Sequence, residues 1–134
     1  MSGETDLGRS LQTLNPERNA GEYVFCLVNF LDRATALQPL GIFREKEGTT
    51  VIITKQQADE LSLPYSVVCA WITLTVHSSL EAVGLTAAVS KALAEANISC
   101  NVVAAYYHDH LFVPLGDVDR AMDVLRTLAK SGGS

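Results

Sequence analysis

The clearest alternation of hydrophobic and polar residues lies in the second half of the chain. Over residues 71–77 apolar and polar side chains alternate with a period of two, which predicts a half-buried β-strand. Over residues 85–96 the apolar positions recur at steps of three and four, which predicts an amphipathic helix that closes at Asn97. One strand followed by one helix is therefore expected over residues 71–97.

The pattern continues towards the C-terminus. Apolar side chains alternate over residues 98–107, and a further short strand is expected over residues 111–113, after a polar segment. The two strands imply a tight antiparallel pair. From Val118 to Ala129 the apolar positions again have helical spacing. The second half therefore predicts the order strand, helix, strand, strand, helix.

The first half shows a shortened copy of this order. Two apolar runs flank the polar loop 45–48, whose Gly48 can adopt the positive φ that a hairpin bend often needs. The other elements expected here are a helix over residues 5–20, a strand over residues 23–29, a helical turn over residues 32–37 and a short helix over residues 56–61.

The repeated order predicts an α+β protein of ferredoxin-like fold, in which helices cover antiparallel sheets. We expect a helical N-terminal segment (1–20), a first, shortened module (21–65), a second module (66–130) and a disordered tail (131–134). The second module ends in a helix and lacks a closing strand. We therefore expect the edge of its sheet to be completed by the other half of the chain or by a second subunit, since an uncovered edge invites association.

Composition and charge exclude several classes of protein. The 134 residues suffice for one ordinary core or for two small ones that share an interface. The net charge of −5, without a Lys/Arg cluster, argues against nucleic acid as a partner. The longest apolar runs are far shorter than the roughly 20 residues of a membrane span. The N-terminus lacks the pattern of a secretory signal, so we expect a cytoplasmic protein whose three cysteines are reduced.

Two segments of the second half carry a resemblance to a known family. They are Leu74 to Thr86 (LTVHSSLEAVGLT) and Tyr106 to Pro114 (YYHDHLFVP). With them, the chain resembles the stand-alone tandem ACT-domain proteins of bacteria, which are similar to the regulatory ACT modules of aspartate kinases and to the animal cytosolic arginine sensor. The resemblance is specific over residues 71–130 and looser over residues 21–65.

The resemblance implies a regulatory protein that binds a small molecule, often an amino acid, at a module or subunit interface, within a homodimer. In the family the ligand lies between the loop that enters the first helix and the second strand with its following turn. The corresponding residues here are Ser78, Ser79, Val83, Gly84, Leu85 and Thr86 in the loop, and Asn101, Tyr106, Tyr107, His108, Asp109 and His110 in the strand and turn.

The residues themselves agree with such a site. Gly84 would let the backbone approach a ligand closely, and free N–H groups at the helix start near Leu85 and Thr86 could hold a carboxylate. Asp109, which matches an acidic position of the arginine-sensor branch, could bind an ammonium or guanidinium group. Alternatively, Gly84 is only a helix-entry glycine and Asp109 only a turn former.

Other chemistry is less well supported by the sequence. His108 and His110 could supply two metal ligands, but a third ligand is needed, so a polar cluster that lines the ligand cavity is the preferred interpretation. No nucleophile motif surrounds Ser78 and Ser79. We therefore expect no catalytic residues, metal or cofactor. The alternative to a ligand sensor is a structural or regulatory interaction protein whose cavity is vestigial.

Overall fold

The chain divides into two compact units, one of which is inserted into the other. The computed structural model describes residues 14–29, 31–75 and 82–131. Unit 1 consists of Met1–Asn19 and Trp71–Ser134, and unit 2 consists of Ala20–Ala70. Unit 1 is therefore discontinuous in sequence, and its two parts meet through a strand pairing.

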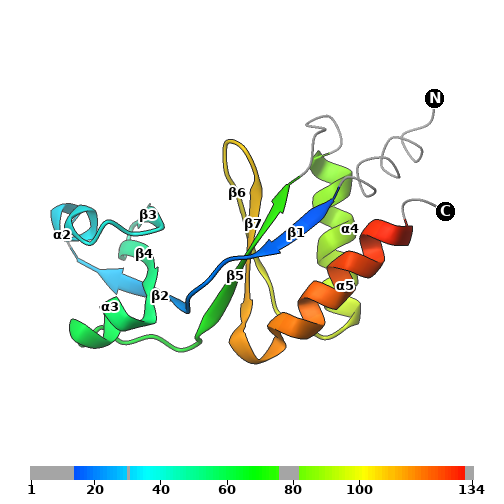
Figure 1. Cartoon of the computed structure of the whole chain (residues 1–134). Helices are drawn as coiled ribbons and strands as arrows, with labels where there is room; N and C mark the ends of the chain where they lie inside the picture. The colour runs from blue at the N-terminus through cyan, green and yellow to red at the C-terminus, as the bar shows by residue number, and fades with distance from the viewer. Residues whose placement is uncertain (1–13, 30, 76–81, 132–134) are drawn as a thin grey trace. The chain divides into compact units, whose positions relative to one another are not determined.

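Unit 1 has a four-stranded sheet with two long helices (Figure 1). The strand order is β1-β5-β7-β6, and helices α4 and α5 lie side by side. The elements are β1 (Asn15–Arg18), β5 (Cys69–Thr75), α4 (Ala82–Glu95), β6 (Asn101–Ala104), β7 (Asp109–Pro114), the 3-10 turn η1 (Leu115–Asp117) and α5 (Val118–Ser131).

Strand β1 takes the place of the missing closing strand. It pairs antiparallel with β5, from Asn15 opposite Thr75 to Arg18 opposite Ile72. Of the two expected partners, the other half of the chain or a second subunit, the first supplies this strand, and it comes from the segment 1–20, outside the predicted first module. The helix predicted over residues 5–20 is wrong over residues 15–18, because the pairing with β5 outweighs a short helical pattern that Pro16 already interrupts. Residues 5–13 of that prediction lie outside the described residues.

The core of unit 1 lies between the sheet and the helices. In β5 the predicted alternation is confirmed, since Ile72 and Leu74 are buried while Trp71 and Thr75 are half-buried. Thr73 is also buried (8% exposed), as the hydrogen bond from Asn19 Nδ2 to Thr73 Oγ1 (2.9 Å) allows. The largest fully buried side chains of the unit are Ile72, Leu74, Leu85, Val89, Leu93, Leu111, Val113 and Leu125.

Two predicted strands of the second half have different limits. Of the strand expected over residues 98–107, only β6 (Asn101–Ala104) forms. The chain turns back at Ala105, whose N–H donates to the carbonyl oxygen of His108 (3.0 Å). The strand expected over residues 111–113 is longer and begins at Asp109. The antiparallel pair itself is confirmed by the ladder from Asn101 opposite Phe112 to Ala104 opposite Asp109.

Unit 2 has the same order of elements as the second half of the chain, strand, helix, strand, strand, helix, with shorter helices. Its elements are β2 (Tyr23–Val28), α2 (Leu31–Ala36), β3 (Gly41–Glu45), β4 (Gly48–Thr54) and α3 (Lys55–Glu60). Strand β4 lies between β3 and β2, and Cys69 at the start of β5 pairs with Tyr23. Both helices contact β2 and β4, and they enclose the buried residues Val24, Cys26, Val28, Ala34, Val51, Ile53 and Ala58.

The predicted hairpin of unit 2 is confirmed, with a tight turn between Glu45 and Gly48. Gly48 has a φ of +153°, and a Cβ added there would lie 2.7 Å from Leu27 Cδ1. The backbone conformation therefore favours glycine at this position, and a larger residue would also displace the end of the Leu27 side chain.

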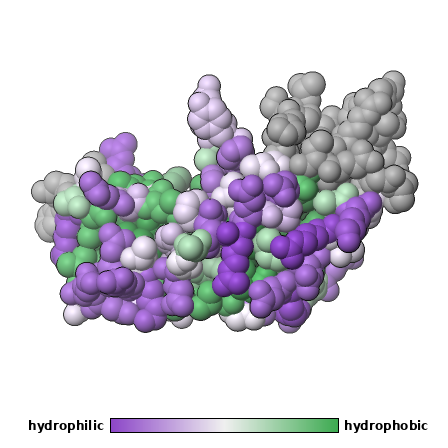
Figure 2. All heavy atoms as spheres, viewed as in Figure 1, coloured by the Kyte–Doolittle hydropathy of each residue, from purple (hydrophilic) through white to green (hydrophobic). Residues whose placement is uncertain are grey.

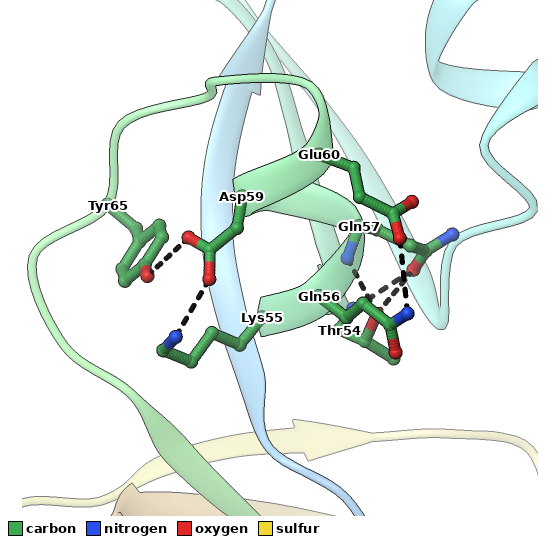
Figure 3. A network of polar contacts seen from close by, with 7 residues as sticks. All are labelled: Thr54, Lys55, Gln56, Gln57, Asp59, Glu60 and Tyr65. Atoms are coloured by element: carbon green, nitrogen blue, oxygen red, sulfur yellow. Dashed lines mark hydrogen bonds and ion pairs between the residues drawn. The ribbon is translucent and has the colours of Figure 1, made fainter.

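Helix α3 begins with a reciprocal pair of hydrogen bonds (Figure 3). The N–H of Gln57 donates to Thr54 Oγ1 (3.1 Å), and the N–H of Thr54 donates to Gln57 Oε1 (3.0 Å). Gln57 Nε2 also donates to the carbonyl oxygen of Leu37 (2.8 Å), which ties α3 to the segment after α2. The capping box therefore stabilises both the helix and its packing.

Substitution of Thr54 by alanine is expected to lower the free energy of unfolding by about 1 kcal/mol, because the N–H of Gln57 loses its acceptor. Chemical denaturation monitored by circular dichroism measures the change. The matched control is Thr127→Ala on the exposed side of α5, where the change should be under about 0.7 kcal/mol and favourable, because alanine is the better helix former. Equal effects at both positions would contradict the capping role.

Candidate functional site

The loop residues predicted to bind a ligand are only partly described. Ser78 and Ser79 lie outside the described residues, and Val83 lies in α4 with its side chain outside them. Gly84 and Thr86 are half-buried, whereas Leu85 is buried in the core. The Leu85 side chain therefore packs in the core, and a role in binding would have to come from the backbone.

The helix that follows this loop begins earlier than the sequence analysis assumed. Since α4 starts at Ala82, the N–H groups without a helical acceptor end at Gly84. The N–H of Thr86 belongs to the next turn and points to the carbonyl group of Ala82, four residues earlier. The N–H groups at the described start of α4 are those of Ala82, Val83 and Gly84.

The turn between β6 and β7 projects from the surface of unit 1 (Figure 2). Tyr106 and Tyr107 are 94% and 81% exposed, and their rings contact each other edge to face, with centroids 5.0 Å apart. His108 is half-buried, and its Nδ1 is inaccessible to solvent without a hydrogen-bond partner among the described residues. Asp109 and His110, the first residues of β7, are also half-buried.

Asn101 is separated from this turn. It is exposed at the start of β6, where it lies opposite Phe112, while the turn follows the other end of the strand. At about 3.3 Å per residue, the strand puts about 10 Å between Asn101 and Ala104. Asn101 is therefore not brought together with the residues of the turn.

The two predicted segments come to the same end of unit 1. Figure 1 shows the last residues of β5, the first turn of α4 and the turn between β6 and β7 at one end of the sheet. The split β-α-β order accounts for this, because the helix returns the chain so that the next strand ends where the first one ends. Gly84 and the segment from Tyr106 to His110 thus lie at a common end.

The best-connected polar group at this end is His110. Trp71 Nε1 donates to His110 Nδ1 (3.0 Å), and Thr73 Oγ1 lies 3.1 Å from the same nitrogen. The Trp71 and His110 rings are tilted by 50° with centroids 5.7 Å apart. Burial lowers the pKa of His110, and the nearby His108 lowers it further, while Asp109 opposes the shift. His110 is therefore neutral near pH 7.

Trp71 was not among the predicted site residues. The alternation along β5 put Trp71 and Thr73 on one face of the strand, opposite Ile72 and Leu74. That signal showed which residues share a face. It could not show that His110, which is 39 residues away, would lie beside them.

A second polar cluster lies on unit 2, on the surface of α3 (Figure 3). Lys55 Nζ donates to Asp59 Oδ2 (2.7 Å), and Tyr65 OH donates to Asp59 Oδ1 (2.7 Å). The hydrogen bond from Lys55 lowers the pKa of Asp59, and the bond from Tyr65 adds to the effect. These groups satisfy one another beside an open hollow of about 460 Å³, so both carboxylate oxygens are already occupied.

Metal and thiol chemistry receive little support from the described residues. Within them, no three His, Cys, Asp or Glu side chains are grouped so that they could hold a metal ion. The three cysteines are free, and burial raises the pKa of each, to about 11 for Cys100. Each thiol is therefore protonated at neutral pH.

Comparison with known families decides the identity of the modules. A family model of the ACT domain matches residues 2–70, and a second model of the ACT domain matches residues 66–127. The chain belongs to the ACT-domain family. Its α+β, ferredoxin-like fold is that of two tandem ACT domains, which are regulatory modules. The first match includes β1, although this strand pairs with β5 within unit 1.

Solved structures agree with this assignment. A Vibrio cholerae protein of unknown function, described as a possible transport protein, is 46% identical over 96% of this chain and 99% of its own, with a TM-score of 0.89. The ligand-free regulatory subunit of aspartate kinase from Thermus thermophilus is 10% identical over 84% of this chain and 95% of its own (TM-score 0.63). A search of curated proteins gives no match.

A third solved structure shares the fold only. Escherichia coli aspartokinase III, in complex with aspartate and ADP, is 15% identical over 86% of this chain and 32% of its own, with a TM-score of 0.59.

None of the helices in the described ranges combines the length and the apolar character required of a membrane-spanning segment.

Proposed function

We propose that this ACT protein is an amino-acid sensor, which binds its ligand at the end of unit 1 where α4 begins and β6 turns into β7. The observation that carries the proposal is the gathering of one carboxylate and two imidazoles, from Asp109, His108 and His110, at the same end as the N-terminus of a 14-residue helix. Membership of a family of regulatory modules supports a binding role over a catalytic one.

The chemistry of an amino acid fits these groups. Its carboxylate would accept hydrogen bonds from N–H groups at the start of α4, where the helix dipole favours negative charge. Gly84, which has no side chain, would let the ligand approach the backbone there. An ammonium or guanidinium group would pair with Asp109. The negative and the positive group of one amino acid would thus each have a partner of opposite charge, the start of α4 and Asp109, at the same end of unit 1.

The proposal includes a cytoplasmic homodimer. Strand β6 ends the sheet order of unit 1, and β3 ends that of unit 2, so each has one edge without a partner strand among the described residues. Such edges favour association with a second copy, which could contribute to the ligand site. Ligand binding would then change how strongly the two copies associate with each other or with a regulated partner.

A screen with each of the common amino acids tests the proposal. A true ligand stabilises the folded state by about 2.7 kcal/mol when its concentration is a hundredfold above its Kd, so the melting temperature should rise with ligand concentration. Isothermal titration calorimetry should give heat with the same amino acid. If no amino acid shifts the melting temperature or gives heat at millimolar concentration, the sensor function is wrong.

A further inference from the structure

The hydrogen bond between Trp71 and His110 decides which imidazole nitrogen carries a proton. An indole N–H can only donate, so His110 Nδ1, 3.0 Å from Trp71 Nε1, must be the acceptor. A neutral imidazole has one donor and one acceptor nitrogen. The proton of His110 is therefore on Nε2.

A second group on β5 is compatible with this assignment. Thr73 Oγ1 lies 3.1 Å from His110 Nδ1 and already accepts a hydrogen bond from Asn19 Nδ2 (2.9 Å). Because Nδ1 of the neutral ring carries no proton, this contact can only use the hydroxyl hydrogen of Thr73. Asn19 is itself held by the bond from its backbone N–H to the carbonyl oxygen of Trp71 (2.9 Å). His110 Nδ1 thus faces two donors, both on β5.

A proton on Nδ1 would be opposed by this arrangement. The imidazolium ion would turn an N–H towards the N–H of Trp71, so protonation requires the hydrogen bond to break. Among the described residues, the ionisable groups that act on His110 are its chain neighbours His108 and Asp109. From β1, Glu17 lies opposite Thr73. From β6 the residue opposite His110 is the apolar Val103.

The other nitrogen of His110 is left for a ligand or solvent. Within the described part of the chain, both hydrogen bonds of His110 use Nδ1. We propose that Trp71 is a positioning residue, which holds His110 so that Nε2–H donates a hydrogen bond to a carbonyl or carboxylate oxygen of the ligand. The inference rests on the proposed function, and it makes His110 an uncharged hydrogen-bond donor.

Nuclear magnetic resonance of the ¹⁵N-labelled protein tests the state of His110 without any ligand. Long-range ¹H–¹⁵N correlations should identify the Nε2–H form, with a titration midpoint below the usual value for histidine. Trp71→Phe should move the midpoint upward, because the neutral form loses a hydrogen bond. Thr73→Val removes the second donor and should act in the same direction if Trp71→Phe does not fold. An Nδ1–H form, or a midpoint unchanged in both variants, would overturn the inference.

Binding of the amino acid with the largest thermal shift tests the ligand contact. His110→Gln carries an amide N–H near the position of Nε2 and should bind with an affinity close to that of the wild type. His110→Asn is too short to supply this donor and should bind about 2–10-fold more weakly. Equal binding by the two variants would overturn the contact.

The two failures are distinguishable. If no amino acid binds, the proposed function fails and the ligand contact of His110 fails with it. A wrong tautomer in the free protein overturns the present inference alone, because the sensor function does not require it.

Discussion

A chain shortened to begin at Ala20 is expected to lose the cooperative unfolding transition of unit 1. The shortened chain lacks β1, which supplies the closing strand of the sheet and packs against α5. It also lacks Leu14, which is 5% exposed. Removal of one buried leucine costs about 2–5 kcal/mol, and each lost hydrogen bond of the ladder about 0.5–1.5 kcal/mol more. These losses approach the whole stability of a small domain, about 5–15 kcal/mol.

Thermal melting followed by circular dichroism measures this loss, with hydrogen exchange to locate it in α4 and α5. The matched control is a chain that begins at Leu14, which keeps β1, Leu14 and the hydrogen bonds of Asn19. It should retain the transition of unit 1. If both shortened chains melt like the full chain, β1 is dispensable and the discontinuous unit is wrong.

Substitution of Asp109 by asparagine is expected to weaken the binding of the amino acid found in the screen by about 10–100-fold. A charge-assisted hydrogen bond from an ammonium or guanidinium group is worth about 1.5–3 kcal/mol, and the uncharged amide retains only part of it. The backbone pairing of Asp109 with Ala104 does not depend on its side chain, so the fold should persist. Calorimetric titration of both proteins measures the ratio of the Kd values.

The control for this substitution is Asp123→Asn in α5. It makes the same change in net charge at a side chain that is 81% exposed and forms a surface ion pair with Arg126 (3.8 Å). Its Kd should match that of the wild type. Equal weakening by both variants would show that net charge, and not a contact with Asp109, governs binding.

The sequence determined the elements whose patterns are local. The alternation in β5 and the helical spacing in α4 and α5 have periods that depend only on backbone geometry, so they could be recognised without the fold. The hairpin at Gly48 could be recognised for the same reason. The motifs from Leu74 to Thr86 and from Tyr106 to Pro114 also sufficed for the ACT family, which the family models confirm.

Only the tertiary structure decided which distant segments meet. A weak helical pattern before Pro16 said nothing of a strand that pairs with β5, 60 residues further along in the rung from Asn15 to Thr75. Nor did the sequence indicate that Trp71 would donate to His110. Such contacts carry no local period, because they depend on how the helices return the chain to the sheet. The sequence therefore determined the ACT modules, while the place of β1 in the sheet and the hydrogen bond from Trp71 to His110 came from the packing of unit 1.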